Sequence, residues 1–340
     1  MRNDTRKHFT AYLARIQQLN GVDDATVTFS VDPSIQQTLE TKIQESSEFL
    51  GRINIIGVDE QSGDKIGLGI SGPSASTTNT AVQAREPSNL VTLDEQGYVC
   101  TKTDFDTFLT YGQLDAWAKF KDFQVRIASA IQRRQALDRI MIGFNGTSRA
   151  ATSNKALNPL LQDVNKGWLQ KYREFAAARV ISEVEAASGK VKVGASATDA
   201  TGYKNLDAVV LDATNSLIEP WYQENPDLVV ICGRKLLADK YFPIVNQTQA
   251  NTEKLAADIV ISQKRIGNLP AVRVPFFPAN ALMITSLQNL SIYYQISARR
   301  RHIKEEPERD RIVNFESSNE SYVVEDYGFG CVVENIELVA

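Results

Sequence analysis

The sequence has 340 residues, a length typical of roughly two domains, and its 43% hydrophobic and 23% charged residues are usual for a globular protein. Its two histidines and three cysteines are scattered, which excludes both the clustered ligands of a Cys/His zinc site and the disulfide framework of a small secreted protein. The net charge of -4 excludes the overall basicity of a typical nucleic-acid-binding protein.

No targeting or membrane segment is expected. No stretch approaches the roughly 18 consecutive apolar residues of a membrane-spanning helix. The N-terminus carries Arg2, Arg6, Lys7 and Arg15 but lacks the continuous apolar run of a secretory signal. The isolated cysteines favour a reducing compartment. We therefore expect a soluble protein that has no membrane partner and stays in the compartment where it is made.

Two short helices are predicted near the N-terminus. Phe9, Tyr12 and Ile16 recur at three- and four-residue spacing, which predicts an amphipathic helix over 9–19. A second helix is predicted over 34–50, after the turn at Asp32-Pro33. Helices this short are marginal in water, so each requires a surface against which to pack.

The region from 52 to 111 reads as a long β-arm. Residues 52–70 predict two strands around the turn 61–64, and residues 97–111 predict a further strand rich in threonine and aromatic residues. Between them, residues 71–90 are small and polar, which is typical of a mobile loop. Because a narrow arm is marginal by itself, it is either a flap on its own subunit or an arm that reaches a neighbouring subunit.

The longest helix is predicted over 113–142, where thirty residues would extend for about 45 Å. Its lysines and arginines are expected to form a solvated face. A third amphipathic helix is predicted over 158–175, and the small, polar residues of 190–203 indicate a loop or a boundary.

Helices and strands are interleaved in the last third of the chain. Helices are predicted over 205–218 and 234–242, and strands over 227–233, 271–277, 281–285 and 290–296. The stretch 299–311 mixes charges of both signs and is expected to be an exposed crossover, followed by two or three antiparallel strands. Because helices and strands do not alternate strictly, the fold class is predicted to be α+β.

Short motifs give no support for catalysis. Gly67, Gly69 and Gly72 fit a dinucleotide fingerprint, but Pro73 and a polar loop follow them instead of a helix. The Ser62–Lys65 tetrapeptide lacks the companion motifs of penicillin-recognising enzymes. His8 and His302 are poorly placed for a catalytic triad, and Cys232 reads as a buried hydrophobic residue.

Adjacent acidic pairs, Glu305-Glu306 and Glu325-Asp326, remain weak acid/base candidates, because neighbours in sequence rarely face each other. No catalytic, cofactor-binding or metal-ligating residue is therefore assigned, and no cofactor is expected.

Long strings of the sequence resemble, in order, the major capsid protein of Peduovirus-type tailed phages. The match covers nearly the whole chain and weakens at 71–96 and 176–204. The strings that carry it include QESSEFLGRINI (44–55), LDAWAKFKDFQVRI (114–127), RRQALDRIMIGFNG (133–146), NPLLQDVNKGWLQKYR (158–173) and SYVVEDYGFGCVVEN (321–335).

The resemblance implies the Hong Kong 97-like phage capsid fold. Its parts would be an N-terminal segment (1–31), an N-arm (32–54), an extended β-loop (55–111), a peripheral domain (112–204) built on the spine helix 113–142, an axial domain (205–298) and return strands of the peripheral domain (299–340).

The resemblance also implies a structural, non-enzymatic function. Copies of the chain would assemble as hexamers and pentamers into an icosahedral head that encloses double-stranded DNA, with a portal protein and a scaffold or prohead protease as further partners. The head would form in the bacterial cytoplasm. The protease would remove residues 1–31, so that Phe29, Ser30 and Val31 mark the candidate cleavage region.

Two alternatives stay open at this stage: an encapsulin-like shell of a cellular nanocompartment, and a hydrolase that uses carboxylates in an axial-domain cleft. If the chain lines a DNA-filled head, its modest acidic excess would let DNA slide past the wall. Which face carries the lysines and arginines then matters more than their sum.

Overall fold

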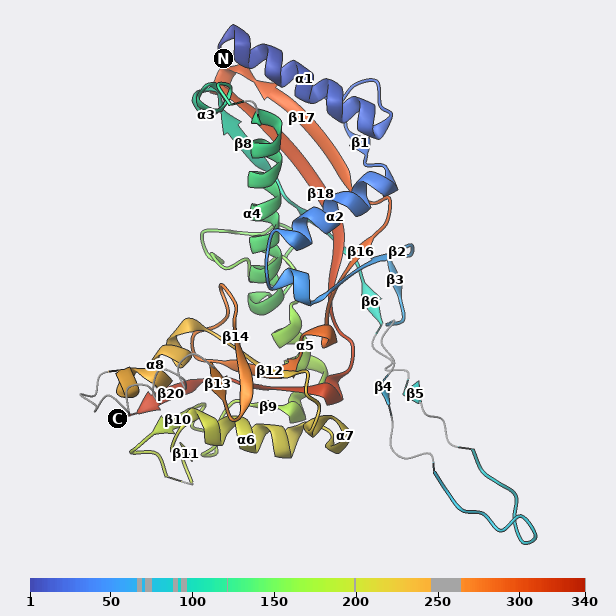
Figure 1. Cartoon of the computed structure of the whole chain (residues 1–340), viewed down its shortest axis with the longest axis vertical. Coiled ribbons are helices and arrows are strands. Elements are labelled where there is room, and N and C mark those ends of the chain that lie inside the picture. Colours follow the sequence, from blue (N-terminus) through green and yellow to red (C-terminus); the bar gives the residue numbers. More distant parts are fainter. Residues whose placement is uncertain are drawn as a thin grey trace, which may run out of the picture.

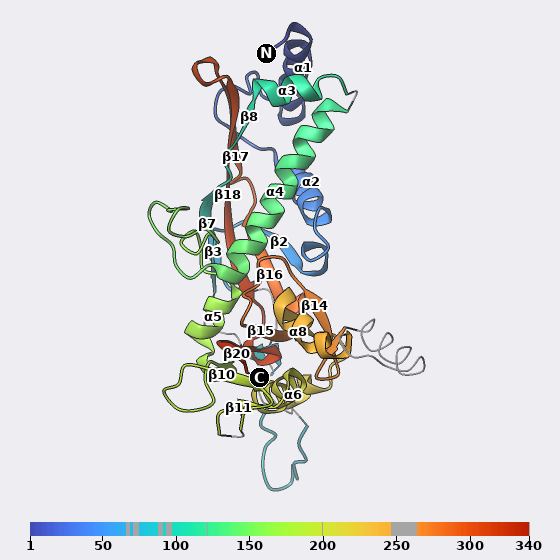
Figure 2. The same ribbon diagram turned by 90° about the vertical axis from the view of Figure 1, so that its left-hand side faces the viewer.

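The computed structural model describes residues 1–65, 69–70, 75–87, 91–92, 97–120, 122–198, 200–245 and 264–339. Figures 1 and 2 show an elongated molecule in which a long sheet with helices beside it forms one half. A second group of shorter sheets and helices forms the other half. The mixture of helices, antiparallel pairs and parallel pairs confirms the predicted α+β class.

The long sheet is organised around one strand. This strand, β18, pairs along one edge with β17 and β16 and along the other with β8 and β7. It therefore lies at the centre of the half that contains the long sheet, which we call the upper half; the other is the lower half. The seven strands of the sheet are β1 (Phe29–Ser30), β2 (Asn54–Val58), β7 (Thr101–Asp104), β8 (Thr107–Thr110), β16 (Leu290–Gln295), β17 (Arg300–Glu306) and β18 (Arg311–Val324).

Four helices lie beside this sheet: α1 (Asn3–Asn20), α2 (Pro33–Glu45), α3 (Tyr111–Trp117) and α4 (Phe123–Asn145). The predicted helix over 9–19 is confirmed and begins earlier, at Asn3. The helix predicted over 34–50 ends at Glu45, and the short 3-10 helix η1 (Leu50–Arg52) follows it. Asp32 caps α2 by accepting a hydrogen bond from the Ser34 amide, and Pro33 occupies the first turn.

The prediction of one continuous helix over 113–142 is wrong, because the chain breaks between α3 and α4. Leu114 and Phe123 are nine positions apart, which on a continuous helix is about two and a half turns and would set them on opposite faces. In the structure both side chains are buried in the same apolar cluster, with Ile127. The break lets two helices supply one cluster.

The lower half contains a six-stranded sheet and a three-stranded sheet. The first has the order β13 (Arg265–Ile266), β14 (Leu269–Arg273), β12 (Leu228–Cys232), β15 (Leu282–Ser286), β19 (Gly330–Val333) and β9 (Val180–Ile181). The second has the order β11 (Gly202–Tyr203), β10 (Val191–Gly194) and β20 (Ile336–Val339). The helices of this half are α6 (Leu206–Leu217), α7 (Pro220–Gln223) and α8 (Arg234–Val245).

The six-stranded sheet separates two apolar cores. Alternate residues of a strand point to opposite faces: along β12, Val229 and Ile231 enter the core next to α4 and α5 (Trp168–Phe175), whereas Leu228 and Val230 enter the core next to α6. Both faces are covered, which explains the unbroken apolar run of this strand.

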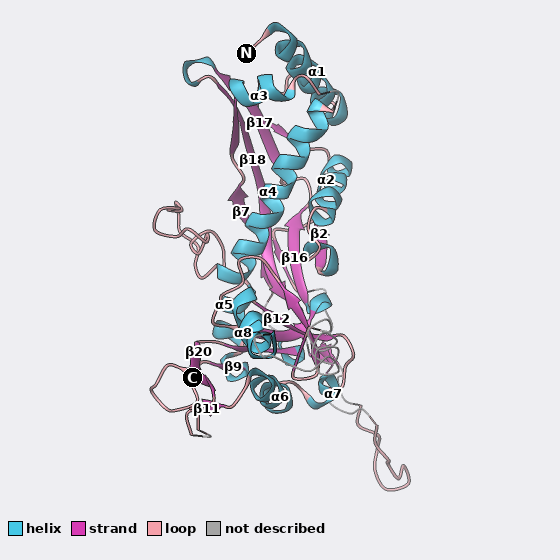
Figure 3. Ribbon diagram, turned by 60° about the vertical axis from the view of Figure 1, so that its left-hand side comes forward, coloured by secondary structure: helices cyan, strands magenta, loops and turns pink. Residues whose placement is uncertain are grey.

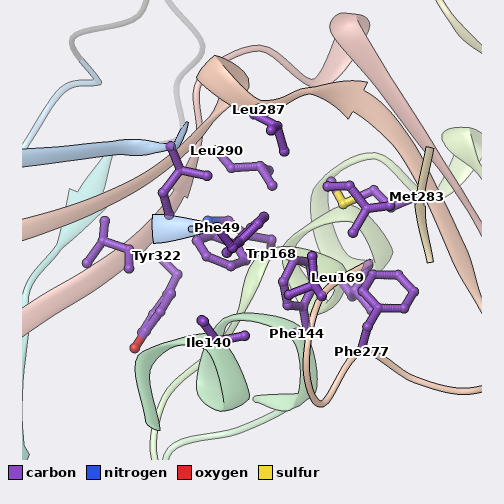
Figure 4. Packing of buried hydrophobic residues seen from close by; sticks show 14 of the residues in the cluster. Phe49, Ile140, Phe144, Trp168, Leu169, Phe277, Met283, Leu287, Leu290 and Tyr322 are labelled. Carbon is purple, nitrogen blue, oxygen red and sulfur yellow. The ribbon is translucent and has the colours of Figure 1, made fainter. Parts of the chain in front are cut away.

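The upper of these two cores is centred on Trp168. Figure 4 shows its indole among Phe49, Phe144 and Tyr322, and the ring centroids of Phe144 and Tyr322 lie 5.0 and 5.4 Å from it in edge-to-face geometry. Its ring nitrogen donates to the Ser291 carbonyl at 3.1 Å. Phe49, α4, α5 and the long sheet therefore meet at one side chain.

The helix predicted over 158–175 is also shorter than expected, since only α5 is helical and residues 158–167 form a loop. Leu161 has a φ of 58°, which no α-helix accommodates. At the start of α5 a Cβ on Gly167 would lie 2.3 Å from the Gly143 carbonyl oxygen. The end of α4 therefore approaches the start of α5 too closely for any side chain there.

The charged stretch 299–311 is a strand and not an exposed crossover, which corrects the prediction. Residues 300–306 form β17, the short 3-10 helix η4 (Pro307–Arg309) makes the turn, and β18 begins at Arg311. Arg299 is completely buried. Mixed charge predicted exposure, but here the acidic partners of the buried arginine are buried with it.

Strands from 205–298 and from 299–340 occur in both the long sheet and the sheets of the lower half. Strand β16 belongs to the long sheet, whereas β19 and β20 pair with β15 and β10 in the lower half. Residues 190–203, expected to be a loop, contribute β10 and β11. Apolar runs predict that a strand is buried but do not identify its sheet. The short 3-10 helices η2 (Ala177–Arg179), η3 (Leu287–Asn289) and η5 (Tyr327–Phe329) complete this half.

The prediction of two strands around a turn at 61–64 is wrong, because β2 pairs with β16 and residues of the predicted turn form a strand, β3 (Ser62–Gly63). The extended loop is instead closed by two short pairs of strands. β3 pairs with β6 (Tyr98–Val99), and β4 (Gly69–Ile70) pairs with β5 (Val91–Thr92), both antiparallel. Figures 1 and 3 show this loop leading away from the two halves. Nearly all side chains of 75–87 are exposed. The remaining predicted loop residues within 66–96 lie outside the described residues.

Candidate functional site

The motifs considered for catalysis do not converge in the structure. Gly69 lies in β4, while Gly67 and Gly72 are outside the described residues. Ser62 lies in β3, and the Lys65 ammonium is 4.4 Å from the centre of the Tyr327 ring. His8 stacks near Phe123, with ring centroids 5.7 Å apart, and the His302 ring lies 5.8 Å from that of Phe315. These side chains serve packing in separate parts of the fold.

The adjacent acidic pairs have structural partners. Glu305 accepts hydrogen bonds from Arg6 and Tyr111, and Glu306 accepts one from Arg311. Glu325 accepts from Tyr293 at 2.9 Å, and Asp326 accepts from Tyr222 at 2.8 Å. The two members of each pair therefore face different neighbours.

The three cysteine thiols are buried and free. Burial raises the pKa of Cys232 to about 11 and that of Cys100 to about 12, so both thiols stay protonated near neutral pH. The described residues hold no group of three or more His, Cys, Asp or Glu side chains arranged to bind a metal ion. Among the described helices, none is long and apolar enough to cross a membrane.

The candidate cleavage region forms part of the long sheet. Phe29 and Ser30 form β1, which pairs antiparallel with Arg301 and Arg300 of β17. The Val31 amide donates to the Arg299 carbonyl at 2.9 Å, and the side chains of Phe29 and Val31 are buried. Because a protease requires an extended and accessible chain, cleavage near Phe29, Ser30 or Val31 would require β1 to leave the edge of the sheet first.

The N-terminal segment docks through helix α1 upstream of this junction. Phe9, Tyr12 and Ile16 bury their side chains against Leu114 and Ile127 of α3 and α4. Charged groups flank the apolar contact: the Arg6 guanidinium makes two hydrogen bonds to Glu305, at 2.6 and 2.7 Å, and Arg301 donates to the Tyr12 hydroxyl at 2.9 Å. The N-terminal segment thus covers apolar surface of the upper half.

A buried ionic centre joins helix α2 to α4 and the long sheet. We use this term for Glu40 of α2, Gln135 and Arg139 of α4, Arg299 before β17, and Glu316 and Glu320 of β18. Arg139 donates to Glu40 and Glu320, each at 2.6 Å. Arg299 donates to Glu40 at 2.6 Å and pairs with Glu316 at 2.7 Å. All six residues are at most 4% exposed.

The neighbouring arginines lower the pKa of two acids of the centre, Glu316 and Glu40. Burial by itself would raise the pKa of Glu316, but Arg299 and Arg301 beside it lower that pKa to about 2. Burial opposes ionisation of Glu40 in the same way, and Arg139 and Arg299 overcome it, so that the pKa of Glu40 is lowered. The ion pairs of Glu40 hold α2 against α4 and against the start of β17.

Sequence reasoning missed this centre. A signal was present on both helices: Gln36 and Glu40 share the buried face of α2 with Ile43, and Gln135 and Arg139 share the buried face of α4 with Ile140. Polar residues at helical spacing within an apolar stripe indicate a buried polar network. The two glutamates of β18 that complete it come from almost two hundred residues further along the chain.

Comparisons with known proteins agree with this architecture. The family described as phage major capsid protein, P2 family, matches residues 8–336. The capsid protein of Escherichia phage P2 is 56% identical over 346 residues, covering 99% of this chain and 96% of the relative. The major capsid protein of Serratia phage KSP20 is 46% identical over 341 residues, covering 99% of this chain and 97% of the relative.

A solved structure is similar over the full length. A chain of the satellite phage P4 procapsid that includes the size determination (Sid) protein matches with a TM-score of 0.83 and 53% sequence identity, covering 100% of this chain and 99% of that chain. The match confirms the predicted capsid fold, and the family confirms the prediction of a structural rather than catalytic function. The relatives support a shell protein of phage heads over a cellular compartment or a hydrolase. The chain belongs to the P2 family of phage major capsid proteins.

Proposed function

We propose that this major capsid protein builds the head from pentamers and hexamers in which the extended loop, 55–111, reaches a neighbouring copy. The observation that carries the proposal is the outer part of the loop: β3 pairs with β6 and β4 with β5 in two-stranded sheets separate from the long sheet, and nearly all side chains of 75–87 are exposed. A loop that lies over the next subunit adds contact area while tolerating the different angles of five- and six-membered rings. Many weak contacts of this kind close into a strong shell.

Deleting residues 60–95 tests this proposal. The deletion leaves the apolar cores and the ionic centre intact, so we expect a folded, soluble protein that forms no closed particles. Thermal unfolding verifies the fold, and negative-stain electron microscopy scores the particles. A graded deletion of 75–87 alone serves as the comparison and should reduce the yield of particles. Normal particles from the larger deletion would overturn the assembly role of the loop.

The same proposal includes removal of residues 1–31 by a prohead protease, with cleavage near Phe29, Ser30 and Val31. The pairing of β1 with β17 supports a two-step process in which the strand detaches before it is cut. N-terminal sequencing of mature particles tests this, because a start near Asp32 is expected. Mature particles that retain Met1 or Arg2 would rule out the trimming.

A portal protein at one vertex and double-stranded DNA inside the shell complete the proposed assembly. The experiment is to purify heads from lysates and to compare nuclease-resistant DNA with the number of shells. Shells that contain the portal and protect DNA support the proposal, whereas closed shells that never protect DNA would contradict it.

A further inference from the structure

Four cationic side chains line one cleft on the lower half. The cleft lies between the end of the N-arm and the edge formed by β14 and α8, and its volume is about 530 Å³. We call it the basic cleft and define it by Arg52, Arg234, Lys264 and Arg273. Among its described lining residues, Glu48 is the only acid.

The cations of the basic cleft are exposed and lack acidic partners in the described part of the chain. All four residues are exposed, and within the described ranges none of the four takes part in an ion pair. Several other exposed cations are neutralised locally, such as Lys42 by Glu45, at 2.9 Å, and Arg126 by Asp122, at 2.8 Å. Four cations without acidic partners among the described residues thus line one cleft, although the net charge of the chain is -4.

The four separated cations fit a polymer that carries many anionic groups better than a single carboxylate. The four residues come from four separate segments: η1, the start of α8, the residue before β13 and the end of β14. None forms a buried fork like that of Arg139 in the ionic centre, which holds two carboxylates. Exposed arginine and lysine side chains spread around a cleft are the usual contacts of a nucleic-acid backbone, which they bind irrespective of sequence.

We propose that the basic cleft binds the phosphate backbone of double-stranded DNA and marks a surface of the shell that contacts the packaged genome. This inference rests on the proposed function, which places DNA inside the head. It refines the expectation that a modest acidic excess lets DNA slide past the wall: the acidic remainder of the chain keeps DNA mobile, and one cationic cleft per subunit gives a weak, salt-dependent contact.

Binding of a 20-base-pair duplex to the purified full chain tests the proposal by fluorescence anisotropy. For four phosphate contacts, affinity should fall about 100-fold between 50 and 200 mM salt. The variant R52Q/R234Q/K264Q/R273Q should bind at least about tenfold more weakly at 50 mM salt and lose most of this salt dependence. The matched control K7Q/R15Q/R133Q/R309Q removes the same charge from exposed sites elsewhere and should stay within about threefold of the parent.

Two outcomes of this assay would overturn the inference. Equal losses in both variants would mean that net charge, and not the cleft, governs binding. Stronger and cleft-dependent binding of a polyglutamate peptide than of the duplex would assign the cleft to an acidic protein partner instead.

A second measurement uses intact heads and requires no substitution. Acylation of the Lys264 amine should be at least about threefold slower in DNA-filled heads than in the same heads emptied of DNA, whereas Lys304, exposed on β17, should react equally in both. Equal labelling of Lys264 would reject the inference while leaving the shell function intact. Failure to obtain heads at all would instead count against the proposed function.

Discussion

At the scale of single residues, the ionic centre is the feature on which the fold depends most sharply. Arg139 and Arg299 are completely buried, and each is held by two glutamates. Burying charges is costly, so such a centre contributes less to net stability than its short distances suggest. Removing one partner is different, because it leaves buried charges without compensation.

Replacing Arg139 by methionine should therefore lower the free energy of unfolding by about 3–5 kcal/mol. The substitution preserves much of the volume but leaves Glu320 without its ionic partner, and Glu40 keeps only Arg299. Urea denaturation followed by tryptophan fluorescence measures the loss. The control R133M removes an exposed arginine from the same helix and should change stability by no more than about 0.5 kcal/mol. A mild effect of R139M would mean that the centre relaxes or admits water.

The centre also predicts a pH dependence. The pKa of Glu316 is about 2 in the folded chain, below the unfolded value, so its stabilising effect is complete above about pH 5.5 and is lost as the pH falls toward 2. The depression corresponds to about 3 kcal/mol. Denaturation measured at pH 7, 5 and 3 should show that the free energy of unfolding of the parent chain falls with the pH. The variant E316Q should be less stable at pH 7 and flatter with pH, whereas E308Q, at an exposed position, should keep the parental profile.

At the scale of elements, the junction of α4 and α5 sets how the two halves meet. Backbone of the last turn of α4 lies against Gly167, and the Trp168 indole packs over Gly143. Both contacts require the absence of a side chain on the glycine. This junction holds the Trp168 core against the long sheet.

Replacing Gly167 by alanine should destabilise the chain by about 1–3 kcal/mol. The new Cβ would meet the carbonyl oxygens of Gly143 and Ile142 at 2.3 and 2.4 Å, so the two helices must separate. Thermal unfolding measures the change. Gly112 is the matched control, since a Cβ there meets nothing within 4 Å and helix α3 should gain about 0.5–1 kcal/mol from G112A. Equal changes in thermal stability for G167A and G112A would contradict the close approach of Gly167 to the end of α4.

At the scale of the whole molecule, the N-terminal segment forms a cover over apolar surface of the long sheet and its helices. Helix α1 and strand β1 hide apolar side chains of α3, α4 and β17, and the Arg6–Glu305 pair flanks the contact. A short linker joins this cover to the rest of the chain. We therefore expect α1 and β1 to detach and dock again reversibly.

The variant F9A should open this cover, because a buried phenylalanine contributes about 3–5 kcal/mol to packing. Limited trypsin digestion at Arg15 should become markedly faster, while the rest of the chain keeps its protection. The control L19A changes a side chain that is 42% exposed and should leave the digestion rate nearly unchanged. Equal rates for F9A and the parent would show that α1 does not depend on this contact.

The sequence by itself predicted the α+β class, strands β12, β14 and β15 of the lower half, and helices α1 and α6. These features depend on local periodicity and turn residues, which a single sequence displays. The ordered strings that resemble phage capsid proteins also predicted the family, which the comparisons confirm. The arm, loop, peripheral and axial ranges stay predictions.

Only the tertiary structure decided the rest, because it depends on contacts between distant residues. The break between α3 and α4 follows from the need to bring Leu114 and Phe123 into one cluster. The burial of the charged stretch at Arg299 follows from glutamates supplied by α2 and β18. The basic cleft gathers four cations from segments as far apart as residues 52 and 273. Composition determined that the chain is mildly acidic, whereas the fold decided where its free positive charge is gathered.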